Sequence, residues 1–353
     1  MENSAPISPD ASSHPTALQK GIDLAADIIS GTAIPAPVKR NALKAFDRLC
    51  TAAIEIPAAY LEGIAAEKRA ETENRIKLIN KAGDQIAEQM YIDPEYTKAA
   101  VRKFGHKVIR EQINLDRIAE GAAKEIKDNP PESTPQEIKS IDDDWLNTFE
   151  KEAAQKSTED MQRMFSRILA GEIKRPSSFS IKTIKLLAEL DQETATLFRQ
   201  FCSACVTLGV PRSNVVLDAR VPSLGGNAGT NSLSEYGFNF GALNVLQEHG
   251  LIISDYNSWM EYQHAIAQRA EGRLQVTLPI LFQRKYWALV PLADRNPADP
   301  LQIHGVALTK TGQQIASIIE LPENDKFREA LTKYFASQKL GMMEVPAQKN
   351  KPM

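Results

Sequence analysis

The chain has few of the residues that most often cross-link a fold or carry chemistry. Its 353 residues include three cysteines and five histidines. Three cysteines cannot form a disulfide framework, and they are typical of a reducing compartment. No apolar run is long enough to span a bilayer, and the polar N-terminus lacks the basic and apolar segments of a signal peptide. We therefore expect a soluble, cytoplasmic protein without a transmembrane segment.

The chain also lacks a marked excess of charge. It contains 42 Lys and Arg against 45 Asp and Glu, which gives a net charge of -3. This balance provides no general attraction to nucleic acid or to an anionic membrane. The hydrophobic fraction of 42% and the charged fraction of 25% are ordinary for a globular protein. The length allows two or three domains with at least one sizeable core.

Three short motifs resemble chemical sites but have simpler interpretations. Cys202 and Cys205 lie late in an apolar segment, whereas a redox pair favours a helix N-terminus and a structural zinc needs four ligands. The aspartates at 142–144 precede a helix, where carboxylates are common caps. The glycine-rich segment 225–229 lacks the lysine of a phosphate-binding loop and is expected to be a flexible surface loop. We therefore expect no catalytic residue, no metal ion and no cofactor.

The N-terminal third is predicted to form a long helical hairpin. After a disordered tail at 1–15, residues 16–127 are rich in helix-forming residues, and IDPE at 92–95 breaks the pattern. Apolar residues recur at coiled-coil-like spacing before the break and line one side of a second helix after it. Such stripes need a cover, either the rest of the chain or another copy of it. The candidate self-association residues are Ile76, Ile79, Ile86, Met90, Val101, Phe104 and Val108.

Residues 142–209 are predicted to form a compact helical domain after a proline-rich linker at 128–141. Apolar residues recur there at i, i+3, i+4 and i+7, which is the pattern of helices that bury one face. The expected helix boundaries are a cap at Asp144, a capping box from Ser157 and Asp160, a left-handed C-terminal cap at Gly171, caps at Ser180 and Asp191, and an end at Gly209.

Residues 210–339 are predicted to form an α+β domain, followed by a flexible tail at 340–353. The expected order is a helix at 239–249, a hairpin at 273–291, a strand and a Thr-capped helix. This order is typical of a winged-helix-like module.

A winged-helix-like module raises the question of nucleic-acid binding. Arg284 and Lys285, at the tip of the expected hairpin, are the candidate nucleic-acid contacts. The helix at 239–249 carries no Lys or Arg, although phosphate contacts supply most of the affinity for DNA. Nucleic acid is therefore a partner that the sequence allows but does not favour.

Four segments carry a resemblance to known proteins: Asp143 to Leu146, Ser157 to Met161, Arg167 to Glu172 and Pro176 to Ser180. Over roughly residues 20–335 the chain resembles a bacterial family known only as a domain of unknown function. Its central helical domain is similar to that of the abortive-infection alpha proteins. The resemblance implies a bacterial protein, often associated with mobile elements, with phage defence as an expected role. It offers no catalytic residues, and the glycine-rich insert at 223–232 departs from the family pattern.

These observations predict a mainly α fold with a smaller α+β C-terminal part. They also predict a non-enzymatic protein that acts through protein–protein contacts, with the hairpin at 58–127 as its self-association surface. A homo-oligomer is the expected state, and the other protein partner is unknown. Two alternatives stay open: a winged-helix regulator that binds nucleic acid, and a hydrolytic effector whose site is assembled only in space.

Overall fold

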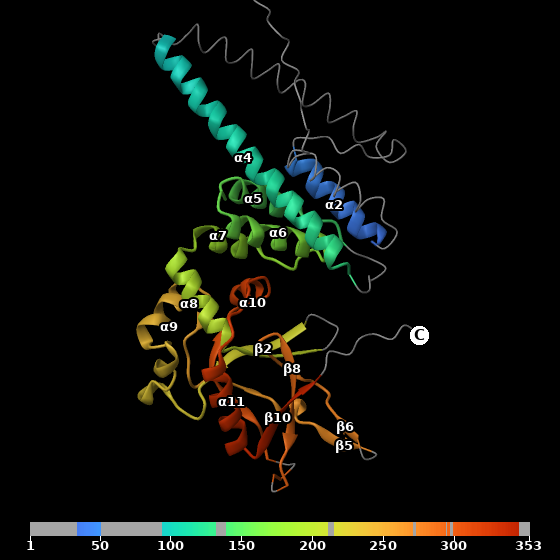
Figure 1. Cartoon of the computed structure of the whole chain (residues 1–353), viewed down its shortest axis with the longest axis vertical. Coiled ribbons are helices and arrows are strands. Elements are labelled where there is room, and N and C mark those ends of the chain that lie inside the picture. Colours follow the sequence, from blue (N-terminus) through green and yellow to red (C-terminus); the bar gives the residue numbers. More distant parts are fainter. Residues whose placement is uncertain are drawn as a thin grey trace, which may run out of the picture. The chain divides into compact units, whose positions relative to one another are not determined.

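The chain divides into two compact units, and Figure 1 shows the described residues of both as a computed structural model. Unit 1 is Met1–Ile184 and unit 2 is Lys185–Met353. Helices and an antiparallel sheet make up the described part, so the predicted mainly α fold with a β-containing C-terminal part is confirmed. No helix in this part is long and apolar enough to cross a membrane. The structure describes residues 34–50, 94–131, 139–210, 215–270, 273–293, 295–296 and 299–345.

Unit 1 is a group of helices around a core that includes the buried rings of Phe46, Phe149 and Phe165. The long helix α4 packs against the other three. The helices are α2 (Ala36–Leu49), α4 (Pro94–Asp128), α5 (Asp143–Ala153) and α6 (Glu159–Lys174). A further helix, α7 (Ile181–Glu189), begins in unit 1 and ends in unit 2.

Trp145 joins α5 to the turn that follows α6. Its indole Nε1 donates a hydrogen bond to Phe179 O at 2.8 Å, and its ring stacks on Phe149 with 5.1 Å between centroids. Burying an aromatic side chain stabilises a fold by about 1.5–3 kcal/mol, and a buried indole N–H needs a partner. Trp145 has both, so it holds α5 against the turn after α6.

The start of α5 differs from the predicted one by two residues. Asp142, not Asp144, is the N-cap, and its carboxylate accepts the N–H of Trp145 at 2.9 Å. Asp144 lies in the first turn, where a carboxylate still interacts favourably with the helix dipole. The predicted cap at Ser180 is confirmed, since Thr183 N–H donates to its Oγ at 3.2 Å.

Both predicted boundaries of α6 are wrong. Its N-cap is Thr158, without a side-chain hydrogen bond, so Ser157 and Asp160 do not form a capping box. Gly171 lies inside the helix and not at its end. A Cβ at this position would be 2.6 Å from the Phe179 ring. Glycine is needed at position 171 because the ring packs against the helix there, not because the backbone turns left-handed.

Unit 2 is built on an antiparallel sheet with the strand order β10-β8-β7-β1-β2-β9-β3, in which β4 pairs with β9. The strands of this sheet are β1 (Val206–Val210), β2 (Val215–Pro222), β3 (Ile252–Ile253), β4 (Trp259–Glu261), β7 (Ile280–Phe282), β8 (Lys285–Pro291), β9 (Gln302–Leu308) and β10 (Leu340–Val345). A separate hairpin consists of β5 (Gln268–Ala270) and β6 (Arg273–Gln275). The helices are α8 (Gln192–Ser203), α9 (Phe240–Glu248), α10 (Lys310–Ala316) and α11 (Asp325–Ser337).

Two predicted segments of unit 2 have a different structure. Helix α8 is capped by Asp191 as predicted, but it ends at Ser203 instead of Gly209. Cys205 lies outside the helix, and 206–210 form β1 between β2 and β7. The start of the predicted flexible tail, 340–345, is strand β10. In both places the partner strands come from distant parts of the chain, and their ladders override the local pattern.

The predicted hairpin at 273–291 is only partly formed. Gln283 and Arg284 join β7 to β8 with φ angles of 49° and 62°, the positive pair that a type I′ turn requires. Residues 273–275 instead form β6 and pair with β5. The hairpin belongs to an eight-stranded sheet, and a winged-helix module is not confirmed.

The glycine-rich segment, expected to be a flexible loop, contains a hydrogen-bonded turn. Residues Ala228–Thr230 form a single turn of 3-10 helix. Asn227 Oδ1 accepts from Thr230 N–H, and Thr230 Oγ1 accepts from Asn227 N–H, each at 3.1 Å. This reciprocal capping fixes the turn.

Candidate functional site

The C-terminal half of α4 is anchored to α5 and α6 by buried polar side chains. Asn114 Nδ2 donates to Ala154 O at 2.8 Å, and Gln162 Nε2 donates to Asn114 Oδ1 at 3.1 Å. One turn further on, Ser166 Oγ donates to Ile118 O at 2.9 Å. Each bond satisfies a polar group that would be costly to bury alone. Together they fix the rotation of α4 about its own axis.

The N-terminal half of α4 carries large apolar side chains that are exposed. Phe104 is 68% exposed, Val108 46%, Ile109 60% and Ile113 44%. Scattered apolar residues are normal on a surface, but a contiguous group on one element marks a protein interaction site. These four residues are the candidate functional site of unit 1, and we call them the α4 face.

The α4 face occupies one side of the helix. An α-helix turns by about 100° per residue, so Phe104 and Val108 lie on the same stripe as Leu115, which is buried further along the helix. This stripe is one margin of the α4 face, and Ile109 and Ile113 lie along the other margin. Gly105 lies between the margins, and a Cβ there would have no atom within 4 Å outside the helix itself. A small residue at the centre of an apolar face lets a second helix approach closely.

Basic side chains lie on the opposite side of the same helix segment. Lys103, Lys107 and Arg110 are exposed, and Lys107 Nζ lies 3.7 Å from Glu111 Oε1. These three cations lie on the side away from the α4 face, as in an amphipathic helix. A helix of this kind packs its apolar side against another protein surface.

Of the predicted self-association residues, the structure brings together Phe104 and Val108 on the α4 face. Val101 lies in α4, but its side chain is outside the described part. The remaining four, Ile76, Ile79, Ile86 and Met90, lie outside the described residues.

Ile109 and Ile113 were not among the predicted residues, because a single apolar stripe was expected on this helix. Their spacing of four residues was a visible signal of a second row.

The two candidate nucleic-acid contacts have protein partners. Arg284 donates a short hydrogen bond from its guanidinium to Ile319 O. Lys285 Nζ pairs with Glu344 Oε2 at 3.2 Å on the neighbouring strand. The first bond closes the β7–β8 turn onto the segment after α10, and the second joins β8 to β10. Both cations have roles within the fold.

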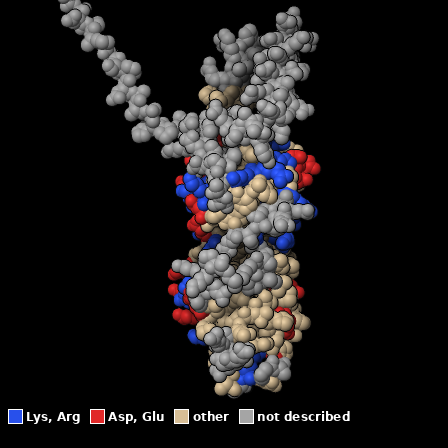
Figure 2. All heavy atoms as spheres, turned by 90° about the vertical axis from the view of Figure 1, so that its right-hand side faces the viewer, with Lys and Arg blue, Asp and Glu red and all other residues tan. Residues whose placement is uncertain are grey.

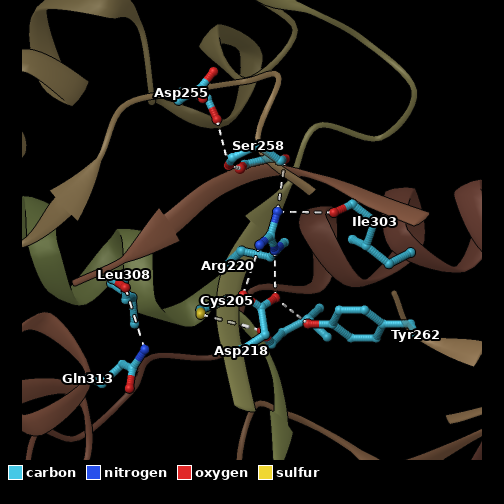
Figure 3. A network of polar contacts seen from close by, with 11 residues as sticks. Cys205, Asp218, Arg220, Asp255, Ser258, Tyr262, Ile303, Leu308 and Gln313 are labelled. Carbon is cyan, nitrogen blue, oxygen red and sulfur yellow. Dashed lines mark hydrogen bonds and ion pairs between the residues drawn. The ribbon is translucent and has the colours of Figure 1, made fainter. Parts of the chain in front are cut away.

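Unit 2 contains a buried ion pair that the sequence analysis did not identify (Figure 3). Arg220 binds both carboxylate oxygens of Asp218, at 2.5 and 2.8 Å, and Tyr262 OH donates to the same carboxylate at 2.8 Å. A third guanidinium nitrogen donates to Ser258 O at 2.9 Å and Ile303 O at 3.1 Å. This network joins β2, β9 and the segment before β4.

The network of Asp218 and Arg220 has the character of a structural element. Arg220 is 4% exposed and Asp218 6%. Burial raises the pKa of the Tyr262 hydroxyl well above its ordinary value, and Asp218 raises it further, so the phenol keeps its proton. Removing one partner of a buried pair of this kind leaves an uncompensated charge, which is strongly destabilising.

The cysteine pair lacks the features of a redox site. Burial raises the pKa values of the Cys202 and Cys205 thiols; Cys205 raises that of Cys202 further, and Asp218 raises that of Cys205. Thiolate is the reactive form of cysteine, so both thiols are held in the inert form. Among the residues that the structure describes, no group of three or more His, Cys, Asp or Glu side chains could hold a metal ion.

The fold and the site define a protein of two units. Unit 1 is helical and carries an exposed amphipathic helix, and unit 2 is an α+β unit built on an antiparallel sheet. The chain belongs to the family described as "Protein of unknown function (DUF2806)", whose model matches residues 99–332. The matched segment includes the α4 face and most of unit 2. It supports the predicted domain-of-unknown-function family and carries no link to abortive-infection proteins. No curated protein and no solved structure matches the chain.

Proposed function

We propose that this protein is not an enzyme and acts through protein–protein contacts made by the α4 face. The observation that carries the proposal is the exposure of Phe104, Val108, Ile109 and Ile113 on a helix whose other half is anchored. The anchor matters because a rigid surface loses less conformational entropy on binding than a flexible one.

A second copy of the chain is the partner that we propose for the α4 face, because an apolar face can pack against its own copy across a two-fold axis. Gly105 lies on this face, and a Cβ there would have no atom within 4 Å outside the helix itself, so a second helix can come close.

The test is the oligomeric state of the full chain with charges placed in the α4 face. We expect Phe104→Glu with Ile109→Glu to abolish association by this surface while circular dichroism stays unchanged. The matched control is Lys103→Glu with Arg110→Glu, two substitutions on the opposite side of the same helix, which should leave association intact. Light scattering at micromolar concentration measures the mass. A wild-type chain that stays monomeric contradicts the proposal.

Phage defence is the cellular role we propose for this contact. Its support is the resemblance of the segments between Asp143 and Ser180 to abortive-infection proteins. A phage-challenge plating assay, with and without the gene, tests the role. The Phe104→Glu with Ile109→Glu variant should lose any protection, because the proposed activity depends on the α4 face. Equal plaque numbers with and without the wild-type gene contradict this role.

A nucleic-acid-binding regulator has less support. The tip cations Arg284 and Lys285 are engaged by Ile319 O and Glu344, and α9 carries no Lys or Arg. Measuring DNA binding at low salt, with and without Arg284→Ala and Lys285→Ala, distinguishes the two functions. Salt-dependent binding that is lost in the double variant would favour the regulator.

A further inference from the structure

Strand β10 is the terminal strand of the sheet in unit 2. It pairs with β8 in an unbroken register, from Leu340 opposite Pro291 to Val345 opposite Tyr286. Within the part of the chain that the structure describes, no other strand pairs with it. Natural proteins usually protect such an edge with lysine, proline or a bulge. Residues 340–345 contain none of the three.

Hydrogen bonds beside β10 show which of its backbone groups face outward. Leu292 N–H donates to Lys339 O at 3.0 Å, so these two residues form a hydrogen-bonded pair. Leu289 O accepts from Ala267 N–H, at 2.7 Å, on the other side of β8. Bonded and non-bonded pairs alternate along an antiparallel ladder. The backbone groups that face away from the sheet are therefore those of Leu340, Met342 and Glu344.

Apolar side chains border this edge. Met343 is 43% exposed, Tyr286 40% and Leu292 47%. Gly341 leaves a shallow space between them, because a Cβ there would find its nearest atoms at 3.8 Å, in Val290 O, and 3.9 Å, in Leu292 Cδ2. Figure 2 shows one face of the molecule, on which uncharged side chains cover much of the described surface of unit 2 and charged side chains lie mainly toward the margins.

We propose that β10 binds the β10 strand of a second copy, antiparallel, so that two sheets become one across a two-fold axis. The outward groups of Leu340, Met342 and Glu344 can bond only to the outward groups of the other strand. Among the registers that meet this requirement, one pairs all three residues: Met342 lies opposite Met342, and Leu340 lies opposite Glu344 of the second copy. A two-fold contact needs a self-complementary surface.

Side chains are complementary in this register. Met343 of each copy lies opposite Gly341 of the other, over the exposed Leu292. Glu344 is already paired with Lys285 at 3.2 Å, so the edge carries no net negative charge. Glu344 lies opposite Leu340 of the other copy, so like charges are not directly opposite one another in this register.

This contact is independent of the α4 face, because it uses only unit 2. Two different two-fold contacts on one chain join copies into an assembly larger than a dimer, closed or open-ended. Blocking either contact alone should reduce the assembly to a dimer, and blocking both should leave a monomer. The two proposals can therefore fail separately.

The first experiment tests the register by cross-linking. In full-length chains with Cys50→Ser, Met342→Cys places two thiols at the two-fold axis, where paired strands are about 5.5 Å apart and a disulfide can form. The matched control is Glu344→Cys, which lies opposite Leu340 and far from its own copy. Under mild oxidation we expect a covalent dimer from Met342→Cys alone. Equal cross-linking of both variants, or none of either, overturns the register.

The second experiment tests the contact by mass. Met343→Lys adds the charge that edge strands usually carry, and Ile253→Lys is its control on β3, an exposed apolar position at the other end of the sheet. The background is the chain with Phe104→Glu and Ile109→Glu, for which light scattering should give the mass of a dimer. Adding Met343→Lys should reduce the mass to that of a monomer, and adding Ile253→Lys should leave the dimer intact. Circular dichroism and thermal unfolding confirm that each variant folds. A monomer before Met343→Lys is added, or a dimer that survives it, overturns the proposal.

Discussion

The carboxylate of Glu172 accepts the backbone N–H of Phe179 at 3.0 Å and that of Ser177 at 2.6 Å. Glu172 lies on α6 and is 2% exposed, while Ser177 has a left-handed φ of 71°. The carboxylate therefore holds the turn after α6 in an unfavourable backbone conformation. Phe179 O, in the same turn, accepts the indole N–H of Trp145. One buried charge thus fixes the contact between α6, this turn and α5.

The stability of unit 1 should depend on the protonation of Glu172. Burial raises the pKa of Glu172 above its ordinary value of 4.5, although the N–H groups of Ser177 and Phe179 lower it. The folded state then binds the proton more tightly than the unfolded state. The stabilisation from this group is complete below pH 4.5 and is lost as the pH rises through the folded-state pKa.

Urea unfolding of wild type and Glu172→Gln between about pH 4 and pH 7 measures this dependence. The free energy of unfolding of wild type should fall relative to the variant as the pH rises. The substitution removes one acceptor oxygen at every pH and therefore shifts the free energy of unfolding by a constant amount. Only the change with pH of the difference between wild type and variant tests the assignment. A difference that grows in favour of wild type with rising pH would contradict the assignment.

Two glycines of α4 should respond in opposite ways to alanine. A Cβ on Gly121 would lie 2.4 Å from Ser166 Oγ, at the close approach of α4 and α6. Gly121→Ala should destabilise unit 1 by about 1–3 kcal/mol through overpacking. Gly105→Ala meets nothing within 4 Å and should stabilise the helix by up to about 1 kcal/mol. Denaturant unfolding in the Phe104→Glu, Ile109→Glu background removes the effect of association. Equal effects at both positions would contradict the close approach.

Local signals in the sequence predicted the elements whose boundaries depend on local chemistry. Asp191 and Thr309 cap their helices through their own side chains, as predicted. The sequence did not predict β1 or β10, because their apolar residues fit a helix end or a tail equally well. Their structure depends on partners far away in the chain: Val206 pairs with Arg220, and Leu340 with Pro291.

The candidate sites show the same division between local and distant effects. Spacing placed Phe104 and Val108 on one side of a helix. Their exposure depends on where α2 and α6 stop contacting α4, which no local pattern encodes. The pairing of Lys285 with Glu344 also depends on the β8–β10 ladder. It engages a side chain that was predicted from the sequence as a nucleic-acid contact.

Breaking the buried ion pair of unit 2 should be far more costly than breaking an exposed one. Asp218→Asn leaves the guanidinium of Arg220 buried without its countercharge, and we expect a loss of about 3–5 kcal/mol. Asp325→Asn is the matched control, because Asp325 pairs with Arg328 at 2.7 Å with both side chains largely exposed. It should cost about 0.2–1 kcal/mol. Chemical denaturation followed by a probe in unit 2 compares them, and similar losses would mean that the Asp218 pair is not desolvated.

The three thiols should stay unreactive until the chain unfolds. Burial, together with the nearby Asp116 and Asp47, raises the pKa of Cys50 to about 12, while Cys202 and Cys205 are buried with raised pKa values. Thiolate is the species that attacks a thiol reagent, so labelling near pH 8 should be slow for the folded protein. Adding guanidinium chloride should release three fast-reacting thiols per chain. Fast labelling of Cys202 and Cys205 before unfolding, or their oxidation to a disulfide by a mild oxidant, would contradict a structural role and make the pair a redox site.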